Sequence, residues 1–382
     1  MTANQQPDAK PRPKKQEQEP ARNEISEVAP GILRMELPIR IPGLAHVNCY
    51  ALLDENGAAV VDPGLPGPAT WRAIKDRLRQ ADLRVRDVHT VIVTHSHPDH
   101  FGCATHFALK AGAKVVAHDS FSFLPYGQTR EPEISLNDLG HEGCHERAAG
   151  AAEDPDASGE SPAKVVAPVS TSGAGRTPWG SEEARPPLKM RLKWRLMRLM
   201  ARRSFVPDIT HPVVDGQRLR LARREWTVVH TPGHTGDHIC LHDPETGTFL
   251  TGDHVLPTIT PHISGLTPAA DPLLAFFQSL DRVAAIEGVR TVLPAHGHPF
   301  ASLSDRSEAI KQHHFERLDE VKAIARDLGP ATVEAFSQRL FRERHWGWMA
   351  ESETFAHLEH LRHAREAECH RANDGTLIYS AG

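Results

Sequence analysis

"VTHSHPDHFG", residues Val93–Gly102, concentrates three histidines and one aspartate in six consecutive positions directly after the apolar run VHTVIV. Imidazole nitrogens and carboxylate oxygens are ligands for zinc and similar divalent metals, and a tight turn after a strand can point several of them inward. The alternative is a polar loop in a chain with 25 histidines, but composition alone produces this spacing in well under about one chain in a hundred. The stretch therefore predicts a metal site at the end of a strand, with the candidate ligands His95, His97, Asp99 and His100.

The segments around this stretch alternate between strand and helix patterns. NCYALLD and GAAVVD predict a β-hairpin with Gly57 in its turn, PATWRAIKDRLRQAD has helical spacing, and FGCATHFALKAG predicts a helix that ends at Gly112. The alternation resumes with WTVVH, HICLHD, TFLTGD, the helical PLLAFFQSLDRVAAI and the strand-like RTVLP. This alternation is typical of an α/β layered fold, and 382 residues suffice for one large domain and one smaller domain.

Composition disfavours several classes of protein. The 44 basic and 49 acidic residues leave a formal charge of −5, which disfavours a nucleic-acid binder by bulk charge. The five cysteines are scattered and odd in number, which argues against a secreted disulfide framework. The polar N-terminus lacks the apolar core of a signal peptide, and no stretch has about 18 uninterrupted apolar residues. We therefore expect a soluble, cytoplasmic protein whose residues 1–24 form a disordered leader.

Three further segments each end a predicted strand with a ligand-type residue: His234 in VVHTPGHTGDH, Asp253 in FLTGDH and His296 in TVLPAHGHP. The motifs HxHxDH, TPGHT, TGDH and PAHG, in this order, resemble those of the metallo-β-lactamase-fold hydrolases over residues 27–299, apart from an insertion at 142–185. The resemblance implies a four-layer αβ/βα sandwich over residues 25–304, with metals at one edge between the sheets. It also implies a ligand set for each of two metals and one shared ligand: His95, His97 and His234 for the first, Asp99, His100 and His296 for the second, and Asp253 between them.

Two divalent ions in such a site make hydroxide from water and polarise the substrate oxygen, so a shared hydroxide serves as the nucleophile. Zinc is the expected metal, with manganese or iron as alternatives. Asp99 is the candidate catalytic residue, because it ligates one metal and is placed to orient the hydroxide. His254 is either a partner of the ligands and proton donor or an ordinary packed side chain. The remaining histidines of these segments are expected to be structural or to support the ligands: His230, His242, His262 and His298.

The residue types at the candidate ligand positions narrow the class of reaction within the family. True zinc β-lactamases usually carry a cysteine or serine where this chain has Asp253, so the resemblance disfavours antibiotic hydrolysis. The pattern is closer to the glyoxalase-II-like thioesterases, the lactonases and the ribonuclease members. A persulfide dioxygenase with a single iron shares much of the motif and stays open as an alternative.

Residues 305–382 predict three helices and a final hairpin that turns at NDG. Three helices with a small β-wing resemble the winged-helix domain appended to the lactamase-β-like proteins, some of which are glyoxalase-like hydrolases and one a single-strand endoribonuclease. Two roles are open for such a domain. It either packs against the hydrolase domain and walls one side of the active site, which we favour, or it binds nucleic acid.

Residues 142–185 are rich in Ala, Gly, Pro, Ser and acidic residues and predict a disordered insertion. The next segment, 186–205, is basic and helical in spacing, and four arginines form one stripe on it: Arg191, Arg195, Arg198 and Arg202. The stripe is either a solvated face or a contact for an anionic partner. The second alternative has support because like charges at this spacing repel each other and an anionic partner would relieve the repulsion. Coenzyme A phosphates, an RNA backbone or peripheral contact with a membrane surface would each serve.

These observations together predict a binuclear metal-dependent hydrolase that acts on a small anionic thioester or other ester, with acyl-CoA-type compounds as the specific expectation. The alternative acts on a different class of substrate. It is a single-strand endoribonuclease, in which the same hydroxide attacks phosphorus. The sequence leaves a homo-oligomer open.

Overall fold

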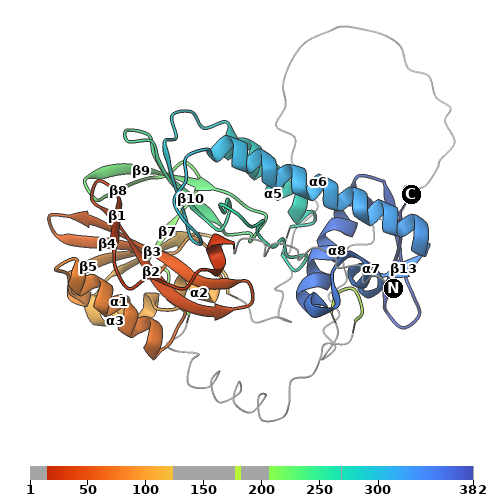
Figure 1. The fold of residues 1–382 in the computed structure, drawn as a ribbon, viewed down its shortest axis with the longest axis horizontal. Coiled ribbons are helices and arrows are strands. Elements are labelled where there is room, and N and C mark those ends of the chain that lie inside the picture. Colours follow the sequence, from red (N-terminus) through yellow and green to blue (C-terminus); the bar gives the residue numbers. More distant parts are fainter. Residues whose placement is uncertain (1–14, 124–176, 182–205, 268, 382) are drawn as a thin grey trace, which may run out of the picture.

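The computed structural model describes residues 15–123, 177–181, 206–267 and 269–381. These residues form two β-sheets that face each other, helices on both outer faces, and beside them a C-terminal unit that contains a third sheet of three strands (Figure 1). None of the described helices combines the length and the apolar character that crossing a membrane requires.

The first sheet has seven strands in chain order and the second has five in the order β12-β11-β10-β9-β8. The strands of the first sheet are β1 (Ser26–Ala29), β2 (Ile32–Ile41), β3 (Leu44–Asp54), β4 (Gly57–Val61), β5 (Val88–Ile92), β6 (Lys114–His118) and β7 (His211–Val213). Those of the second are β8 (Arg218–Leu221), β9 (Arg224–His230), β10 (Ile239–Asp243), β11 (Thr248–Gly252) and β12 (Thr291–Pro294). Strands β4 to β7 run parallel, and so do β11 and β12.

Successive residues of the central strand β3 face two different cores, because side chains alternate along a strand. Tyr50 and Leu52 pack between the two sheets together with Trp226 of β9. Cys49 and Ala51 face the opposite way, toward helices. The strand is therefore buried on both faces, which accounts for its nearly continuous apolar run.

Helices cover both outer faces of the pair of sheets. The helices α1 (Pro68–Gln80) and α3 (Ala104–Ala111) pack on the first sheet, and α5 (Pro272–Ala284) packs on the second together with the start of α6 (Leu303–Leu328). This arrangement confirms the predicted four-layer αβ/βα sandwich (Figure 1).

Local turn chemistry agrees with the sequence. The hairpin of β3 and β4 pairs Asp54 with Gly57, and the φ of +132° at Gly57 is one that residues with side chains rarely adopt. Helix α1 has Pro68 at its first position, where no main-chain donor is needed. Helix α3 is capped by Gly112 in the left-handed conformation.

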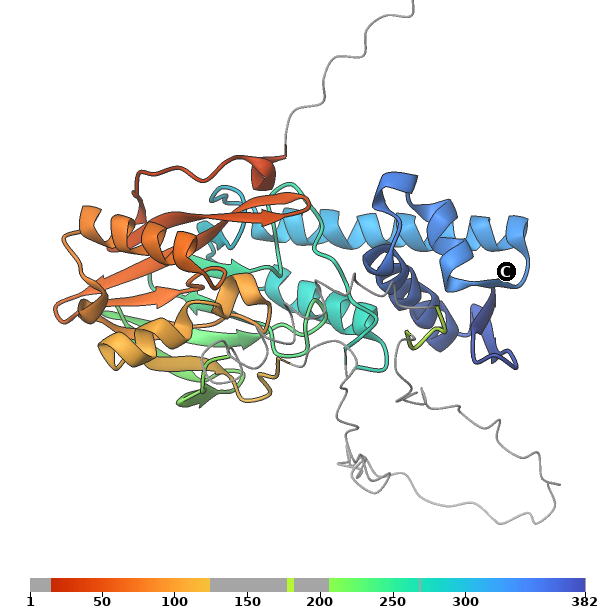
Figure 2. The same cartoon turned by 90° about the horizontal axis from the view of Figure 1, so that it is seen from below.

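The C-terminal unit is joined to the sandwich by α6. This helix has 26 residues, about 39 Å of length, and runs from the second sheet to the C-terminal helices (Figure 2). The other elements of the unit are β13 (Ala331–Thr332), α7 (Val333–Leu340), the short helix Glu343–His345, α8 (Trp348–His363), β14 (Ala367–Arg371) and β15 (Leu377–Ala381). The three predicted helices and the final hairpin are thus present, while their designation as a winged helix stays a prediction. The predicted boundary at 304/305 falls in the first turn of α6, so a continuous helix joins the two parts.

The prediction of a disordered leader over residues 1–24 does not hold for residues 15–24. Residues Gln16–Gln18 form a short helical turn, and the Glu17 side chain is fully buried. Its carboxylate accepts hydrogen bonds from the main-chain amides of Thr258 and Ile259, at 2.9 and 3.1 Å. Buried main-chain donors need acceptors, and Glu17 supplies them.

The prediction of disorder over 142–185 is likewise wrong for Thr177–Ser181. Trp179 is 1% exposed, its ring packs against Phe355 of α8, and its indole nitrogen donates to Glu351 at 2.7 Å. Its carbonyl accepts from the amide of Leu377 at 3.0 Å. The rest of the insertion and the basic segment 186–205, with its arginine stripe, lie outside the described residues.

We expect Trp179→Ala to destabilise the protein by about 3 kcal/mol, because it empties a buried site and leaves the Glu351 carboxylate without its donor. Urea unfolding followed by circular dichroism measures the change. Trp346→Ala is the matched control, since Trp346 is 45% exposed and its loss is expected to cost less than about 1 kcal/mol. Equal effects of the two substitutions would contradict the docking of this segment.

Candidate metal centre

The candidate ligands lie where four strands end at one edge of the sandwich. After β5 the chain turns into the four-residue helix α2 (Pro98–Phe101), with His97 directly before it and Pro98 at its first position. His234 follows β9, Asp253 directly follows β11 and His296 follows β12. Because β11 and β12 are parallel neighbours, their carboxyl ends meet.

One set of ligand atoms comes from His95, His97, His234 and Asp253. The Nδ1 atom of His97 lies 3.0 Å from the Nε2 atom of His95 and 3.2 Å from that of His234. The Oδ2 atom of Asp253 lies 3.9 Å from His95 Nε2 and 3.6 Å from His234 Nε2. Ligands placed tetrahedrally at zinc–nitrogen distances are about 3.3 Å apart. The spacing of these four atoms therefore fits one metal ion.

A second set comes from Asp99, His100 and His296. The Oδ2 atom of Asp99 is 3.6 Å from the Nε2 atoms of both His100 and His296. Asp253 adjoins this set too, with Oδ2 3.5 Å from His100 Nε2 and Oδ1 3.3 Å from His296 Nε2. Asp253 thus lies close to both sets, and its role as the shared ligand stays a prediction from the family resemblance.

Several of these atoms lack a hydrogen-bond partner although they are buried: His100 Nε2, His296 Nε2 and Asp253 Oδ1. A buried polar atom without a partner costs roughly 1–3 kcal/mol, so a ligand that binds these three atoms would be favoured. A divalent cation at the two sets would satisfy all three. The donor set of imidazoles and carboxylates suits zinc and also manganese or iron.

The three histidines of the first set are held in the neutral form. Burial lowers the pKa of His234, and it lowers the pKa values of His95 and His97 well below the ordinary histidine value, with further lowering from neighbouring histidines. Neutral imidazole keeps the lone pair that a metal needs.

In the second set, the charges of neighbouring groups outweigh the effect of burial on the pKa values. Burial lowers the pKa of His100, but the carboxylates of Asp253 and Asp99 outweigh it and raise that pKa well above its ordinary value. The same balance raises the pKa of His296. Burial raises the pKa of Asp253, but His296 and His100 outweigh it, so the carboxyl is ionised. A metal bound here would take the place of protons on these imidazoles.

Asp62, which the sequence motifs do not mark, contacts the candidate ligand His100 directly and the candidate ligand His95 through Thr94. Its carboxylate is 2.9 Å from His100 Nδ1 and accepts from the amide and the hydroxyl of Thr94, at 2.9 and 2.8 Å. The same hydroxyl oxygen lies 3.0 Å from His95 Nδ1. The sequence did contain a signal: Asp62 ends a strand, as the ligands do.

Main-chain carbonyls hold two further candidate ligands. His296 Nδ1 donates to the carbonyl of His46 at 2.6 Å, and His234 Nδ1 donates to that of His262 at 2.7 Å. His238, also missed, accepts from the amide of Asp253 at 3.1 Å. Such contacts fix which nitrogen faces the metal.

His254 packs as an ordinary buried side chain. Its ring lies against Phe276 of α5, neither ring nitrogen has a hydrogen-bond partner, and burial lowers its pKa to about 3. This favours the packed alternative over a proton donor. Of the other histidines, His230 stacks on His118 and His298 pairs with Glu19, which are structural roles. His242 packs beside Phe249.

Three of the four described cysteines are unsuited to act as nucleophiles, and the fourth, Cys369, is a half-buried residue of β14 in the C-terminal unit. Cys49, Cys103 and Cys240 are fully buried. Burial raises the pKa of the Cys103 and Cys240 thiols to about 12 and that of Cys49 well above its ordinary value. These thiols are protonated at neutral pH.

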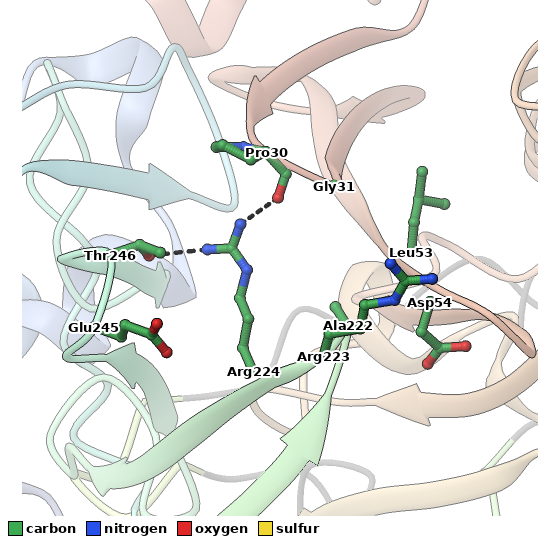
Figure 3. A pocket seen from close by; sticks show the side chains of 9 residues that line it. All are labelled: Pro30, Gly31, Leu53, Asp54, Ala222, Arg223, Arg224, Glu245 and Thr246. Carbon is green, nitrogen blue, oxygen red and sulfur yellow. Dashed lines mark hydrogen bonds between the residues drawn. The ribbon is translucent and has the colours of Figure 1, made fainter.

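A cavity of about 480 Å³ lies at the opposite edge, where the hairpin turns gather (Figure 3). Arg224 in its wall already bonds Asp243 and Thr246 and also the carbonyl of Pro30. The cavity is therefore separate from the candidate metal centre, and its most buried cation is already paired.

Comparison with known proteins places this geometry in context. The family model described as metallo-beta-lactamase superfamily matches residues 42–296. The chain is 24% identical over 335 residues to the probable metallo-hydrolase YqjP of Bacillus subtilis, covering 85% of this chain and 91% of that protein. The crystal structure of a metallo-beta-lactamase family protein from Thermus thermophilus superposes with a TM-score of 0.66 at 27% identity, covering 93% of this chain and all of the other. A shorter match, 34% identical over 87 residues, is to an atrochrysone carboxyl ACP thioesterase of Aspergillus aculeatus and covers 23% of this chain and 25% of that protein.

Proposed function

The chain belongs to the metallo-β-lactamase superfamily and is a metal-dependent hydrolase, and we propose that it is a binuclear enzyme that cleaves a thioester or another ester of a small molecule. The observation that carries the proposal is the position of Asp253, whose carboxylate oxygens lie 3.3–3.9 Å from imidazole nitrogens of both ligand sets. A carboxylate between two sets suits two cations that share it.

When bound, the two cations would polarise the substrate oxygen and lower the pKa of a water molecule. The side chains have separate roles around that chemistry. The imidazoles of the first set would hold their cation as neutral ligands. Asp99 lies 3.6 Å from the imidazoles of His100 and His296, which also adjoin Asp253, and it is 5% exposed, so it is placed to orient the attacking water. No thiol or hydroxyl nucleophile is needed, in keeping with the burial of Cys49, Cys103 and Cys240.

The likeness to a thioesterase supports thioesters among the ester substrates, and acyl-CoA-type compounds are our specific proposal. The predicted arginine stripe at 191–202 would meet the phosphates of such a substrate.

The test is a parallel assay of zinc-loaded and manganese-loaded protein on acyl-CoA and other thioesters, simple esters and single-stranded RNA. We expect turnover of at least one thioester or ester and none of RNA. Cleavage of RNA without ester turnover would overturn the proposal in favour of an endoribonuclease, and its rate would fall steeply as salt rises.

Changing Arg191, Arg195, Arg198 and Arg202 together to glutamine is expected to raise KM for the best anionic substrate about 10-fold or more with little change in kcat. The charges would bind substrate and transition state equally, which affects KM alone. Steady-state kinetics and binding to anionic vesicles measure the outcome. Unchanged KM would contradict substrate contact, and loss of vesicle binding with intact kinetics would assign the stripe to a membrane surface.

A further inference from the structure

The loop that follows Asp253 is held by charged side chains from separate parts of the chain. Arg306 of α6 donates to the carbonyls of Leu256 and Ile259, both at 2.6 Å. Glu17 accepts from the amides of Thr258 and Ile259 on the same loop. The main chain between Asp253 and His262 is therefore fixed on both its donor and its acceptor side.

His262 stands at the end of this loop and makes two contacts of different kinds. Its main-chain carbonyl accepts the Nδ1 proton of the candidate ligand His234, at 2.7 Å. Its ring Nδ1 lies 3.2 Å from Oε2 of Glu353, which belongs to α8 in the C-terminal unit. A ring held in place restricts the backbone that carries it, so Glu353 constrains the same carbonyl that orients His234.

Glu353 is suited to this contact because it is ionised. Burial raises the pKa of its carboxyl, but the hydrogen bond from His262 and the charges of His262, His357 and His314 outweigh it and lower the pKa to about 2. A carboxylate is the stronger acceptor for an imidazole N–H. The contact is also sheltered, with 21% of the His262 side chain and 19% of the Glu353 side chain exposed.

We propose that Glu353 is a positioning residue for the metal centre, which acts through the His262 ring to hold the carbonyl that orients His234. Metal affinity would then depend on a side chain of the C-terminal unit, although that unit supplies none of the ligands that the sequence predicts. The inference rests on the proposed metal centre. Partners of ligating histidines typically change metal affinity 10- to 100-fold, and one further step of separation puts the expected effect of Glu353 near the lower end of that range.

The first experiment compares zinc affinity by competition with a chromophoric chelator in the full chain and in Glu353→Ala and Glu353→Gln. We expect about 10-fold weaker zinc binding for the alanine variant and a smaller loss for glutamine, which keeps a neutral acceptor. Glu359→Ala is the matched control. Glu359 lies on the same helix and is also partnered, by Tyr379 and Arg362, but lies outside the contact with His262. The control is expected to lower stability toward urea while leaving zinc affinity unchanged.

The second experiment is a double-mutant cycle with His262→Ala, which removes the ring and keeps the carbonyl. If Glu353 acts through the ring, Glu353→Ala adds no further loss of zinc affinity in that background. Additive losses would overturn the proposed route, and so would an equal loss in Glu359→Ala. Unchanged affinity in Glu353→Ala, with zinc bound by the parent protein, would overturn this inference alone. A parent protein that binds no metal would overturn the proposed function itself.

Discussion

Asp253→Ala is expected to abolish hydrolysis, with a loss of activity of about three orders of magnitude or more, because it removes a carboxylate whose oxygens lie close to imidazoles of both ligand sets. Elemental analysis should give about two metal ions per parent chain and clearly fewer in the variant. His97→Ala, which removes a ligand from the first set alone, should have a similar effect on activity. Because these side chains lie at the edge of the sandwich, both variants should keep the circular dichroism spectrum of the parent.

Asp281→Ala is the control for Asp253→Ala, since Asp281 is an exposed carboxylate that pairs with Lys311 on the outer helices. It should leave metal content and activity unchanged. A parent protein that purifies active with one iron and no second metal would contradict the binuclear proposal and favour the single-iron alternative.

Asp62→Ala is expected to weaken metal binding 10- to 100-fold and to destabilise the metal-free protein by about 4 kcal/mol. Asp62 is 1% exposed, and its loss leaves the amide and hydroxyl of Thr94 and the ring of His100 without their acceptor. Chelator competition measures the first effect and urea unfolding of the metal-free protein measures the second.

Asp62→Asn separates backbone strain from hydrogen bonding at this position. Asp62 has a φ of +53°, which asparagine tolerates well, so this variant keeps the backbone and one acceptor oxygen. We expect it to lose less stability than the alanine variant. Metal affinity in Asp62→Ala equal to that of the parent would show that Thr94 and His100 do not need the carboxylate to orient the ligands.

Most of the architecture could be predicted from the sequence because its signals are local. The hairpin at Gly57, the helix that starts at Pro68 and the helix that ends at Gly112 each follow from residues within one short segment. The metal motif is equally local, since four candidate ligands lie within six positions. The three distant candidate ligands were proposed because each follows a strand and because their motifs resemble a known family.

Contacts that join distant segments could be recognised only in the tertiary structure. Glu17 and Trp179 lie in stretches whose composition predicts disorder, yet each is buried because a partner elsewhere in the chain supplies its hydrogen bonds. The composition of a segment indicates what that segment can bury by itself. It carries no information on a binding site that other segments of the chain form.

The sequence by itself determined the layered α/β fold and the identity of the candidate ligands, because both depend on residue type at short spacing. The tertiary structure decided how those ligands are oriented. His296 and His234 are held by the main-chain carbonyls of His46 and His262, and a carbonyl is present at every residue, so no residue type marks it. The tertiary structure also brought Glu353 to within 3.2 Å of His262 across 91 positions of the chain, a proximity that arises only when α8 packs beside the loop after β11.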